Sequence, residues 1–262
     1  MAVEIDLAGR AALVTGAGAG IGRAVAVMLA SAGADVAVVD IDADGAAETA
    51  GLVRATGRGA IALVGDMTVP DDVERTVRAA AGELGGLRIA VNNVGMMAGH
   101  PAVPFLDWTP RAMRDVVAGN LLATAYSCQA QARVLGRGGV IVNVSSGETT
   151  RPAPLTALYA AAKAAVNHLT GTLAIELAPL GIRVNAVAPG TTLTRDVEAA
   201  LTPEYRRALE TSIPLGGLSD PQDMARLVLL LVSDFAAHTT GQFVLSDKGA
   251  FLSRNRPELT VD

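Results

Sequence analysis

A tyrosine and a lysine four residues apart, Tyr159 and Lys163, stand in an alanine-rich stretch with helical periodicity. Residues at this spacing lie on one face of a helix, so both side chains can reach one site. Such a pair alone usually consists of two unrelated surface residues, but here Ser145–Ser146 end a predicted strand shortly before it. Ligands of open parallel sheets bind beyond the carboxyl ends of the strands. We therefore expect the Ser146 hydroxyl and the Tyr159–Lys163 pair to converge on one carbonyl group.

A glycine-rich segment follows the first predicted strand and leads directly into a helix. Its spacing is not the literal GxGxxG, because Ile21 takes the final place counted from Gly16. Glycines permit a tight turn and a close approach of the backbone to a pyrophosphate, which then sits at the helix N-terminus. The position between strand and helix favours dinucleotide binding over a flexible turn without a ligand. The cofactor-binding residues predicted here are Gly16, Gly18, Gly20, Ile21 and Gly22.

The second predicted strand ends at Asp40, a suitable distance along the chain for an acid that binds the ribose 2′-hydroxyl of NAD. A 2′-phosphate would meet a like charge there. No Arg or Lys lies within the glycine loop or at Ile41–Asp42 to neutralise it. The sequence therefore predicts NAD rather than NADP, although Asp40 could also serve as a helix cap or turn residue.

The chemistry open to the Tyr159–Lys163 pair depends on the pKa of the tyrosine. A free tyrosine has a pKa of about 10 and is a poor base at neutral pH. A neighbouring lysine ammonium and the positive nicotinamide of NAD⁺ stabilise the phenolate, so we expect the pKa of Tyr159 to be lowered. Ser146 donates a hydrogen bond where negative charge develops on the substrate oxygen. The hydride itself is carried by the cofactor.

Short β-branched runs alternate with longer alanine-rich amphipathic stretches, which predicts right-handed βαβ units. The expected fold is a single-domain α/β Rossmann-type doubly wound sheet of about seven parallel strands, with helices on both faces. Residues 191–218 are the least regular segment: a mobile substrate loop with one short helix, or an ordinary surface excursion. Strands are expected at 11–15, 35–40, 60–65, 88–92, 140–145, 182–187 and 242–246. Helices are expected at 21–32, 43–56, 70–84, 110–135, 156–180 and 221–233.

Composition narrows the class of protein. The 262 residues are half apolar but only 3% aromatic, so one large core of Ala, Val, Leu and Ile is expected. A net charge of −5 disfavours a nucleic-acid partner. The single cysteine, Cys128, and the isolated histidines offer no metal-ligand pattern, so no metal is predicted. The first residues carry no basic segment before an apolar run, and no run suits a membrane span, so a soluble cytoplasmic protein is expected.

Taken together, the motifs resemble the short-chain dehydrogenase/reductase family, in its single-domain form, over nearly the whole chain. Any one of the matching pieces could arise by chance, but their joint order and spacing could not. They are Thr15-Gly16-x-x-x-Gly20-Ile21-Gly22, Asp40, Asp66, Asn92-Asn93-Val94-Gly95, Asn120, Ser146, Tyr159-x-x-x-Lys163 and Pro189-Gly190-x-x-x-Thr194.

The resemblance implies a role for each matching residue. Asn120, Ser146, Tyr159 and Lys163 are the implied catalytic residues. Tyr159 would be the general acid or base, and Ser146 would hydrogen-bond the substrate oxygen. Asn120 would fix a water of the proton relay, and Lys163 would hold the nicotinamide ribose and lower the tyrosine pKa. Asp66 would bind the adenine, and Asn92 would steady the fourth strand. The remaining implied cofactor-binding positions are Met67, Asn93, Val94, Gly95, Pro189, Gly190, Thr192 and Thr194. A homotetramer is also implied, with the helices at 110–135 and 156–180 forming one interface.

Two positions depart from the family pattern, and two functions besides the NAD-dependent oxidoreductase stay open. Val94 replaces a common alanine, and Lys248 stands where the family has glycine, which puts the geometry of that turn in doubt. Met96 and Met97 could line a substrate pocket, while Glu148 and Arg151 follow Ser146 as loop charges or contacts to a polar substrate. The substrate is a secondary alcohol or ketone of unnamed identity. The other functions are an NADPH-dependent ketoreductase, disfavoured by Asp40, and an inactive NAD-binding sensor or scaffold, disfavoured by the four intact catalytic residues.

Overall fold

The computed structural model of the chain describes residues 4–95 and 97–253. Seven parallel strands form one sheet in the order β3-β2-β1-β4-β5-β6-β7. The order reverses direction between β1 and β4, which makes their carboxyl ends the switch point of a doubly wound sheet. The strands are β1 (Ala11–Thr15), β2 (Asp35–Asp40), β3 (Ala60–Val64), β4 (Leu87–Asn92), β5 (Leu135–Val144), β6 (Arg183–Pro189) and β7 (Phe243–Ser246).

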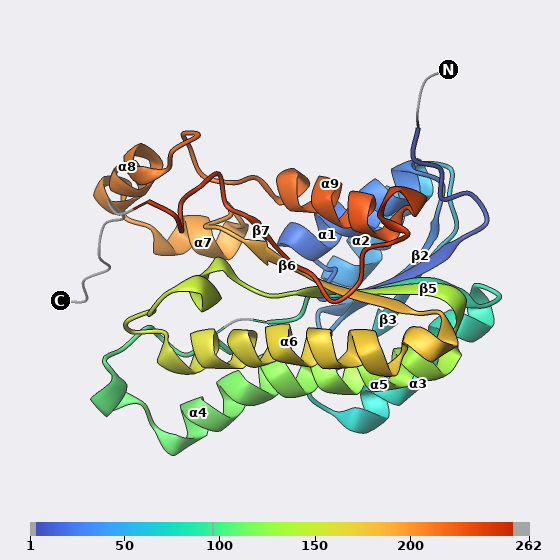
Figure 1. The fold of residues 1–262 in the computed structure, drawn as a ribbon, viewed down its shortest axis with the longest axis horizontal. Helices are drawn as coiled ribbons and strands as arrows, with labels where there is room; N and C mark the ends of the chain where they lie inside the picture. Colours follow the sequence, from blue (N-terminus) through green and yellow to red (C-terminus); the bar gives the residue numbers. More distant parts are fainter. Residues whose placement is uncertain (1–3, 96, 254–262) are drawn as a thin grey trace.

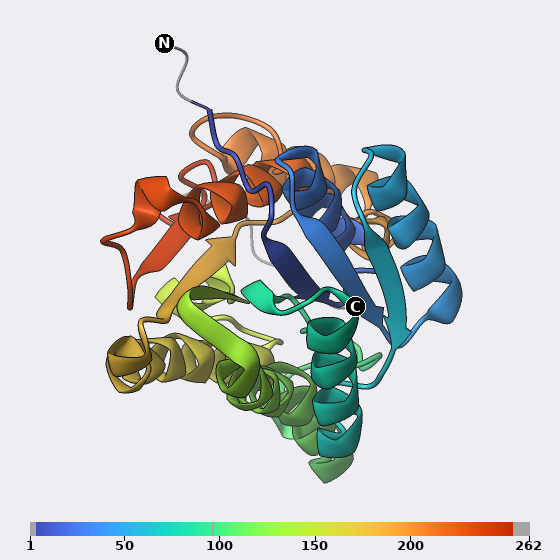
Figure 2. The ribbon, with the colours of Figure 1, turned by 90° about the vertical axis from the view of Figure 1, so that its right-hand side faces the viewer.

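Helices cover both faces of the sheet (Figures 1 and 2). One apolar core lies between the sheet and α1 (Gly20–Ser31), α2 (Ala43–Ala55) and α9 (Pro221–Val232). The other lies beneath α3 (Pro70–Glu83), α5 (Ala123–Val134) and α6 (Ala157–Glu176). Strands buried on both faces read as continuous apolar runs, as β1 does, with all five of its residues buried. The predicted Rossmann-type fold is confirmed.

The helix expected at 110–135 is the main correction to the predicted elements. The structure divides it into α4 (Pro110–Val117), a π-helical turn (Ala118–Leu122) and α5. The apolar periodicity continues across the junction, so the sequence pattern alone does not reveal the extra residue in the turn. Such π turns occur most often at functional sites, and this one contains Asn120.

The least regular predicted segment contains two helices instead of one. Beyond the carboxyl end of β6 the chain forms α7 (Arg195–Ala200) and α8 (Pro203–Ser212), at the left of Figure 1. Each begins at a threonine whose hydroxyl accepts a backbone N–H bond, Thr194 from Val197 and Thr202 from Tyr205. Most other element boundaries lie within about two residues of those expected. The helix expected at 156–180 is α6, which ends at Glu176 and is followed by a separate 3-10 turn (Ala178–Leu180). Strand β5 begins at Leu135, where its pairing with β4 shifts register over the glycine-rich residues 136–139.

Candidate active site

The turn between β1 and α1 has the features of a pyrophosphate site. Ala19, which precedes α1, is extended and provides no side-chain cap, and the first turn of the helix contains no acidic residue. The first N–H groups of a helix have no partner within it, and they attract anions. A Cβ atom on Gly22 would collide with the carbonyl of Gly16, so the turn closes on the helix only without a side chain there. The residues present fit a dinucleotide.

The end of β4 holds this turn in place. The Asn93 amide group donates a 2.9 Å hydrogen bond to the Gly16 carbonyl, and its backbone N–H donates to the Thr15 hydroxyl at 3.2 Å. Val94 also lies against Gly16, because a Cβ atom there would stand 3.2 Å from its side chain. The two neighbouring residues thus brace the glycine turn at the switch point of the sheet.

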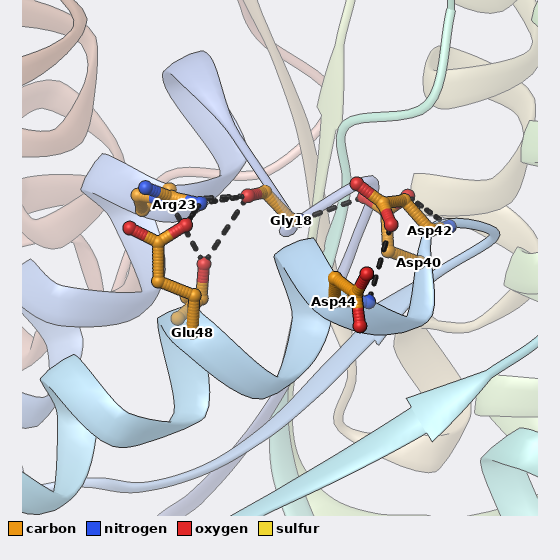
Figure 3. A network of polar contacts seen from close by, with 7 residues as sticks. Gly18, Arg23, Asp40, Asp42, Asp44 and Glu48 are labelled. Carbon is orange, nitrogen blue, oxygen red and sulfur yellow. Dashed lines mark hydrogen bonds and ion pairs between the residues drawn. The ribbon is translucent and has the colours of Figure 1, made fainter.

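Asp40 lies beside the same turn (Figure 3). One carboxylate oxygen accepts a 2.7 Å hydrogen bond from the Gly18 N–H, and the other accepts from the Asp42 N–H at 3.0 Å. The N-terminal cap of α2 is Asp42, whose side chain accepts from Asp44, so Asp40 is not the helix cap. Asp40 therefore places a negative charge at the carboxyl end of β2, next to the glycine turn.

Arg23 contacts the glycine turn from the other side, and sequence analysis did not single it out. Its guanidinium donates to the Gly18 carbonyl, with Nε at 3.1 Å, and to the Thr49 hydroxyl at 3.0 Å. It also pairs with Glu48 at 2.6 Å. Figure 3 shows the peptide of Gly18 held between Arg23 and Asp40. The contact forms because the first turn of α1 places Arg23 next to the glycine turn that precedes the helix. No local sequence motif predicts this contact.

The residues after β3 form a compact turn at the neighbouring strand end. The Asp66 carboxylate accepts hydrogen bonds from the Thr68 N–H at 2.8 Å and from its hydroxyl at 2.7 Å. The Asp66 N–H donates to Asp72 at 2.9 Å. Met67 is buried in the core beneath α3 and α5. Asp66 thus has a fixed orientation where the resemblance implies an adenine contact.

Ser146 and Tyr159 meet beyond the end of β5. The two side chains share a hydrogen bond, and the Ser146 hydroxyl also accepts the Glu148 N–H at 3.2 Å. Ser146 begins the short 3-10 turn Gly147–Thr150, whereas Tyr159 stands in the first turns of α6. The predicted convergence of the strand end and the following helix is present.

Lys163 and Asn120 meet at Gly95. A Cβ atom on Gly95 would collide with the Lys163 ammonium and would stand 2.6 Å from the Asn120 side-chain oxygen. Lys163 is buried, and its Nζ donates to the Val144 carbonyl at 2.8 Å. The amide of Asn120 donates to the Val116 carbonyl at 2.7 Å across the π turn. Two distant segments, the π turn and α6, therefore place functional groups at a single glycine.

Burial shifts the pKa values of both titratable residues. Burial raises the pKa of Tyr159 above its ordinary value; the hydrogen bond with Ser146 opposes this shift and the negative charge of Glu148 adds to it. Burial lowers the pKa of Lys163 to about 8. Among the protein groups, the loss of hydration outweighs the hydrogen bond to Ser146, so the expected lowering of the Tyr159 pKa depends on the positive charge of a bound nicotinamide.

Comparison with known proteins identifies the family. A family model described as enoyl-(acyl carrier protein) reductase matches residues 16–250. The L-rhamnose 1-dehydrogenase (NAD(P)(+)) of Azotobacter vinelandii is 36% identical, over 80% of this chain and 82% of the relative. A solved short chain dehydrogenase from Burkholderia cenocepacia J2315, in complex with NADP, has a TM-score of 0.87 and 37% identity, covering 93% of this chain and 98% of that chain. The chain belongs to the short-chain dehydrogenase/reductase family.

A further structure agrees with this short-chain dehydrogenase/reductase assignment. A 7α-hydroxysteroid dehydrogenase, complexed with NADH and 7-oxo glycochenodeoxycholic acid, has a TM-score of 0.88 and 34% identity, covering 93% of this chain and 95% of that chain. The protein is therefore an oxidoreductase of alcohol and carbonyl groups. The names of the relatives differ in substrate and cofactor, so the family fixes the reaction class and a nicotinamide cofactor but not the choice between NAD and NADP.

The turn after β6 lies beside the glycine turn in this short-chain dehydrogenase/reductase. Gly190 donates its N–H to Ser246 at 3.0 Å, and the Thr192 hydroxyl donates to the Gly190 carbonyl at 3.0 Å. The methyl group of Thr194 lies beside Gly20, 3.1 Å from where a Cβ atom would stand. The predicted residues after β6 thus lie against the glycine turn at the start of α1.

Tyr159 packs against a small apolar cluster. Trp108 is buried with residues of α4, and Met97 and Tyr159 pack against the same cluster. Met97 thus packs in the cluster that contains Tyr159, whereas Met96, the other residue predicted to line a pocket, lies outside the described residues. Within 4–95 and 97–253, no group of three or more His, Cys, Asp or Glu is placed to hold a metal ion. In the same part of the chain, no helix combines the length and apolar character needed to cross a bilayer.

Proposed function

We propose that this enzyme transfers a hydride between NAD(H) and a secondary alcohol or ketone, with Tyr159 as the general acid or base. The hydrogen bond between Tyr159 and Ser146 carries the proposal, since it places two proton-exchanging hydroxyls next to each other, where one substrate oxygen can contact both. A bound nicotinamide supplies or accepts the hydride. Ser146 hydrogen-bonds the substrate oxygen as its charge develops, and Tyr159 gives it a proton in reduction or removes one in oxidation.

The buried groups around Gly95 support this division of roles. Lys163 stands one helical turn after Tyr159 and is held by Val144, at the strand end that leads to Ser146. Its ammonium stabilises the phenolate and holds the cofactor ribose, while Asn120 holds a water that passes protons onward. The retention of all four groups in one place favours catalysis over an inactive sensor.

The test is turnover of a substrate panel followed by nicotinamide absorbance. The panel contains secondary alcohols, ketones, sugars, hydroxysteroids and an enoyl thioester, each with NAD(H) and NADP(H). We expect turnover of an alcohol–ketone pair and its loss by about 10³-fold in Tyr159→Phe. Tyr126→Phe, on α5 and partly buried, is the matched control and should retain activity. Reduction of the enoyl thioester alone, or full activity in Tyr159→Phe, would refute the proposal.

The choice of NAD rests on Asp40. Its carboxylate lies against Gly18 and Asp42, where a 2′-phosphate would meet its charge. We expect NAD(H) to be preferred, and Asp40→Asn to shift the ratio of kcat/KM toward NADP(H) by about tenfold. A preference of the unchanged enzyme for NADP(H) would contradict this part of the proposal and favour the NADPH-dependent ketoreductase.

A homotetramer and a mobile substrate segment complete the proposal. The α6 helix exposes a large apolar side chain, Ile175, and Leu180 after it is also exposed, which supports an interface there. Sedimentation velocity should give four copies per particle, and Ile175→Glu should give a smaller one. Residues 191–218 are proposed to move when the substrate binds, which would appear as slower amide hydrogen exchange in the presence of substrate and cofactor.

A further inference from the structure

Lys248 adopts a backbone conformation that disfavours any residue except glycine. It follows β7 by two positions and has a φ of 56°. Left-handed backbone costs free energy for a residue with a Cβ atom, and such residues persist where the surroundings enforce them, often at functional sites. The family commonly has glycine at this position, so the lysine is unfavourable for the backbone alone. Its side chain must contribute something that glycine would not.

That contribution is a contact with the end of the α7–α8 segment. The Lys248 ammonium donates a 2.9 Å hydrogen bond to the Leu218 carbonyl, and its backbone carbonyl accepts the Leu215 N–H at 3.2 Å. Between these two bonds lie Gly216 and Gly217, both with positive φ and with no described atom within 4 Å of where a Cβ atom would stand. Lys248 thus bonds to the residues on both sides of a glycine pair whose Cβ positions meet no described neighbouring group.

The two ends of the α7–α8 segment lie next to each other and are joined by backbone hydrogen bonds. Leu193 donates its N–H to Ser219 at 2.9 Å, and Ser219 donates to Thr191 at 3.1 Å. The residues between them form a closed excursion that begins beside the glycine turn, where Thr194 lies against Gly20. Both ends of the segment are therefore fixed, and the two glycines lie just before its carboxyl end.

The turn that contains Lys248 also touches the catalytic region. The ring of Phe251 lies against Gly147, the residue after Ser146, because a Cβ atom there would collide with it. The Arg151 guanidinium lies 4.8 Å from the centre of the same ring. Phe251 also packs with Leu209 of α8 in one apolar cluster. The turn is thus placed between the α7–α8 segment and the residues around Ser146.

We propose that Lys248 is a positioning residue that fastens the Gly216–Gly217 hinge and so fixes α7 and α8 beside the substrate side of the site. It acts on substrate affinity and not on the proton-transfer groups. The inference rests on the proposed function for its kinetic effect, but its structural effect, protection of the hinge, is independent of any substrate.

Three substitutions separate the contact of the side chain from the strain of the backbone. Lys248→Gly removes the ammonium and relieves the left-handed strain; Lys248→Met removes the ammonium but keeps the strain and most of the apolar stem. Lys248→Arg keeps a cation that can donate to Leu218. We expect the Gly and Met variants to raise KM for the alcohol by about tenfold, with kcat and NADH affinity changed by less than about threefold. The Lys248→Arg variant should keep the KM of the wild type.

Hydrogen exchange provides the readout that needs no turnover. Peptides covering residues 203–218 should exchange about tenfold faster in the Gly and Met variants, whereas peptides from β1 and β4 should not change. Wild-type exchange and KM in Lys248→Gly would overturn the proposal, as would losses that follow the melting temperature of each variant. If the wild type turns over no member of the panel, the proposed function fails and the exchange result alone decides on Lys248.

Discussion

The Lys163 ammonium donates a 2.8 Å hydrogen bond to the carbonyl of Val144, the last residue of β5 and two positions before Ser146. This bond joins α6 to the strand end that carries Ser146. The lysine therefore has a second effect besides any contact with a cofactor: it fixes the distance between the helix that holds Tyr159 and the serine with which Tyr159 shares a hydrogen bond. The link is a buried charge, which makes it sensitive to pH.

Stability should depend on the protonation of Lys163. Its pKa is about 8 in the folded protein and about 10.5 when unfolded. Between these values the unfolded state binds more protons, so the contribution of Lys163 to the free energy of unfolding rises as pH increases from about 8 to about 10.5. The rise is about 3 kcal/mol.

Urea denaturation of the wild type and of Lys163→Met at pH 7 and pH 10 measures this contribution, because the variant cancels every other titration. The wild type should gain stability relative to the variant on going to pH 10. An equal pH dependence of the two proteins would mean that the pKa of Lys163 is not lowered in the folded state.

Gly95→Ala should inactivate the enzyme without unfolding it. The new methyl group would collide with the Lys163 ammonium and lie 2.6 Å from the Asn120 oxygen, so both groups must shift. A displacement of about 1 Å at a catalytic group costs about 100-fold in rate, and we expect kcat to fall by that factor. Gly119→Ala is the matched control, since no described atom lies within 4 Å of its Cβ position. Full activity of Gly95→Ala would show that the grouping around this glycine is not needed.

The sequence predicted the positions of the glycine turn and of Asp40 in the fold, because the signals for both positions are local. A strand, a run of glycines and a helix follow one another directly, and the acid ends the next strand. The positions of Arg23, Lys248 and the π turn at Asn120 could not be predicted in this way. Arg23 and Lys248 act through the carbonyl groups of Gly18 and Leu218, and a carbonyl carries no sequence signature.

The balance of burial and charge at Tyr159 was also beyond the sequence. A lysine one helical turn away predicted a lowered pKa, but the pKa of Tyr159 depends first on how much water the surrounding residues exclude. Those residues include Trp108 and Met97, which lie far from Tyr159 in the chain. Their packing follows from the complete fold, so only the folded structure gives the direction of the shift.

Arg23 should contribute to cofactor affinity through the Gly18 carbonyl. Arg23→Met removes this charge-assisted bond, and we expect the Kd of NADH to rise about tenfold, measured by fluorescence titration. Glu48→Gln is the control: the Glu48 side chain is 63% exposed, and Arg23 keeps its bond to the carbonyl, so the Kd should change less than about threefold. Equal weakening by both substitutions would instead assign the effect to the ion pair.

Glu148 should set the pH range of the reaction. Its negative charge adds to the effect of burial in raising the pKa of Tyr159, against the hydrogen bond from Ser146. Alcohol oxidation requires the phenolate, so its rate rises with pH through this pKa. Glu148→Gln removes the charge and lowers the pKa of Tyr159, which moves the rising limb of kcat/KM against pH to lower pH.

Profiles of log kcat/KM for oxidation by the wild type, Glu148→Gln and Glu83→Gln test this effect. Glu83 is exposed at the end of α3, so its substitution should leave the profile in place. Carbonyl reduction requires the protonated phenol, so its rate falls as the pH rises through the pKa of Tyr159. In Glu148→Gln this falling limb should also move to lower pH. A common shift of both directions identifies a change in one titrating group, whereas a fall in rate at unchanged pH dependence would make Glu148 a substrate contact instead.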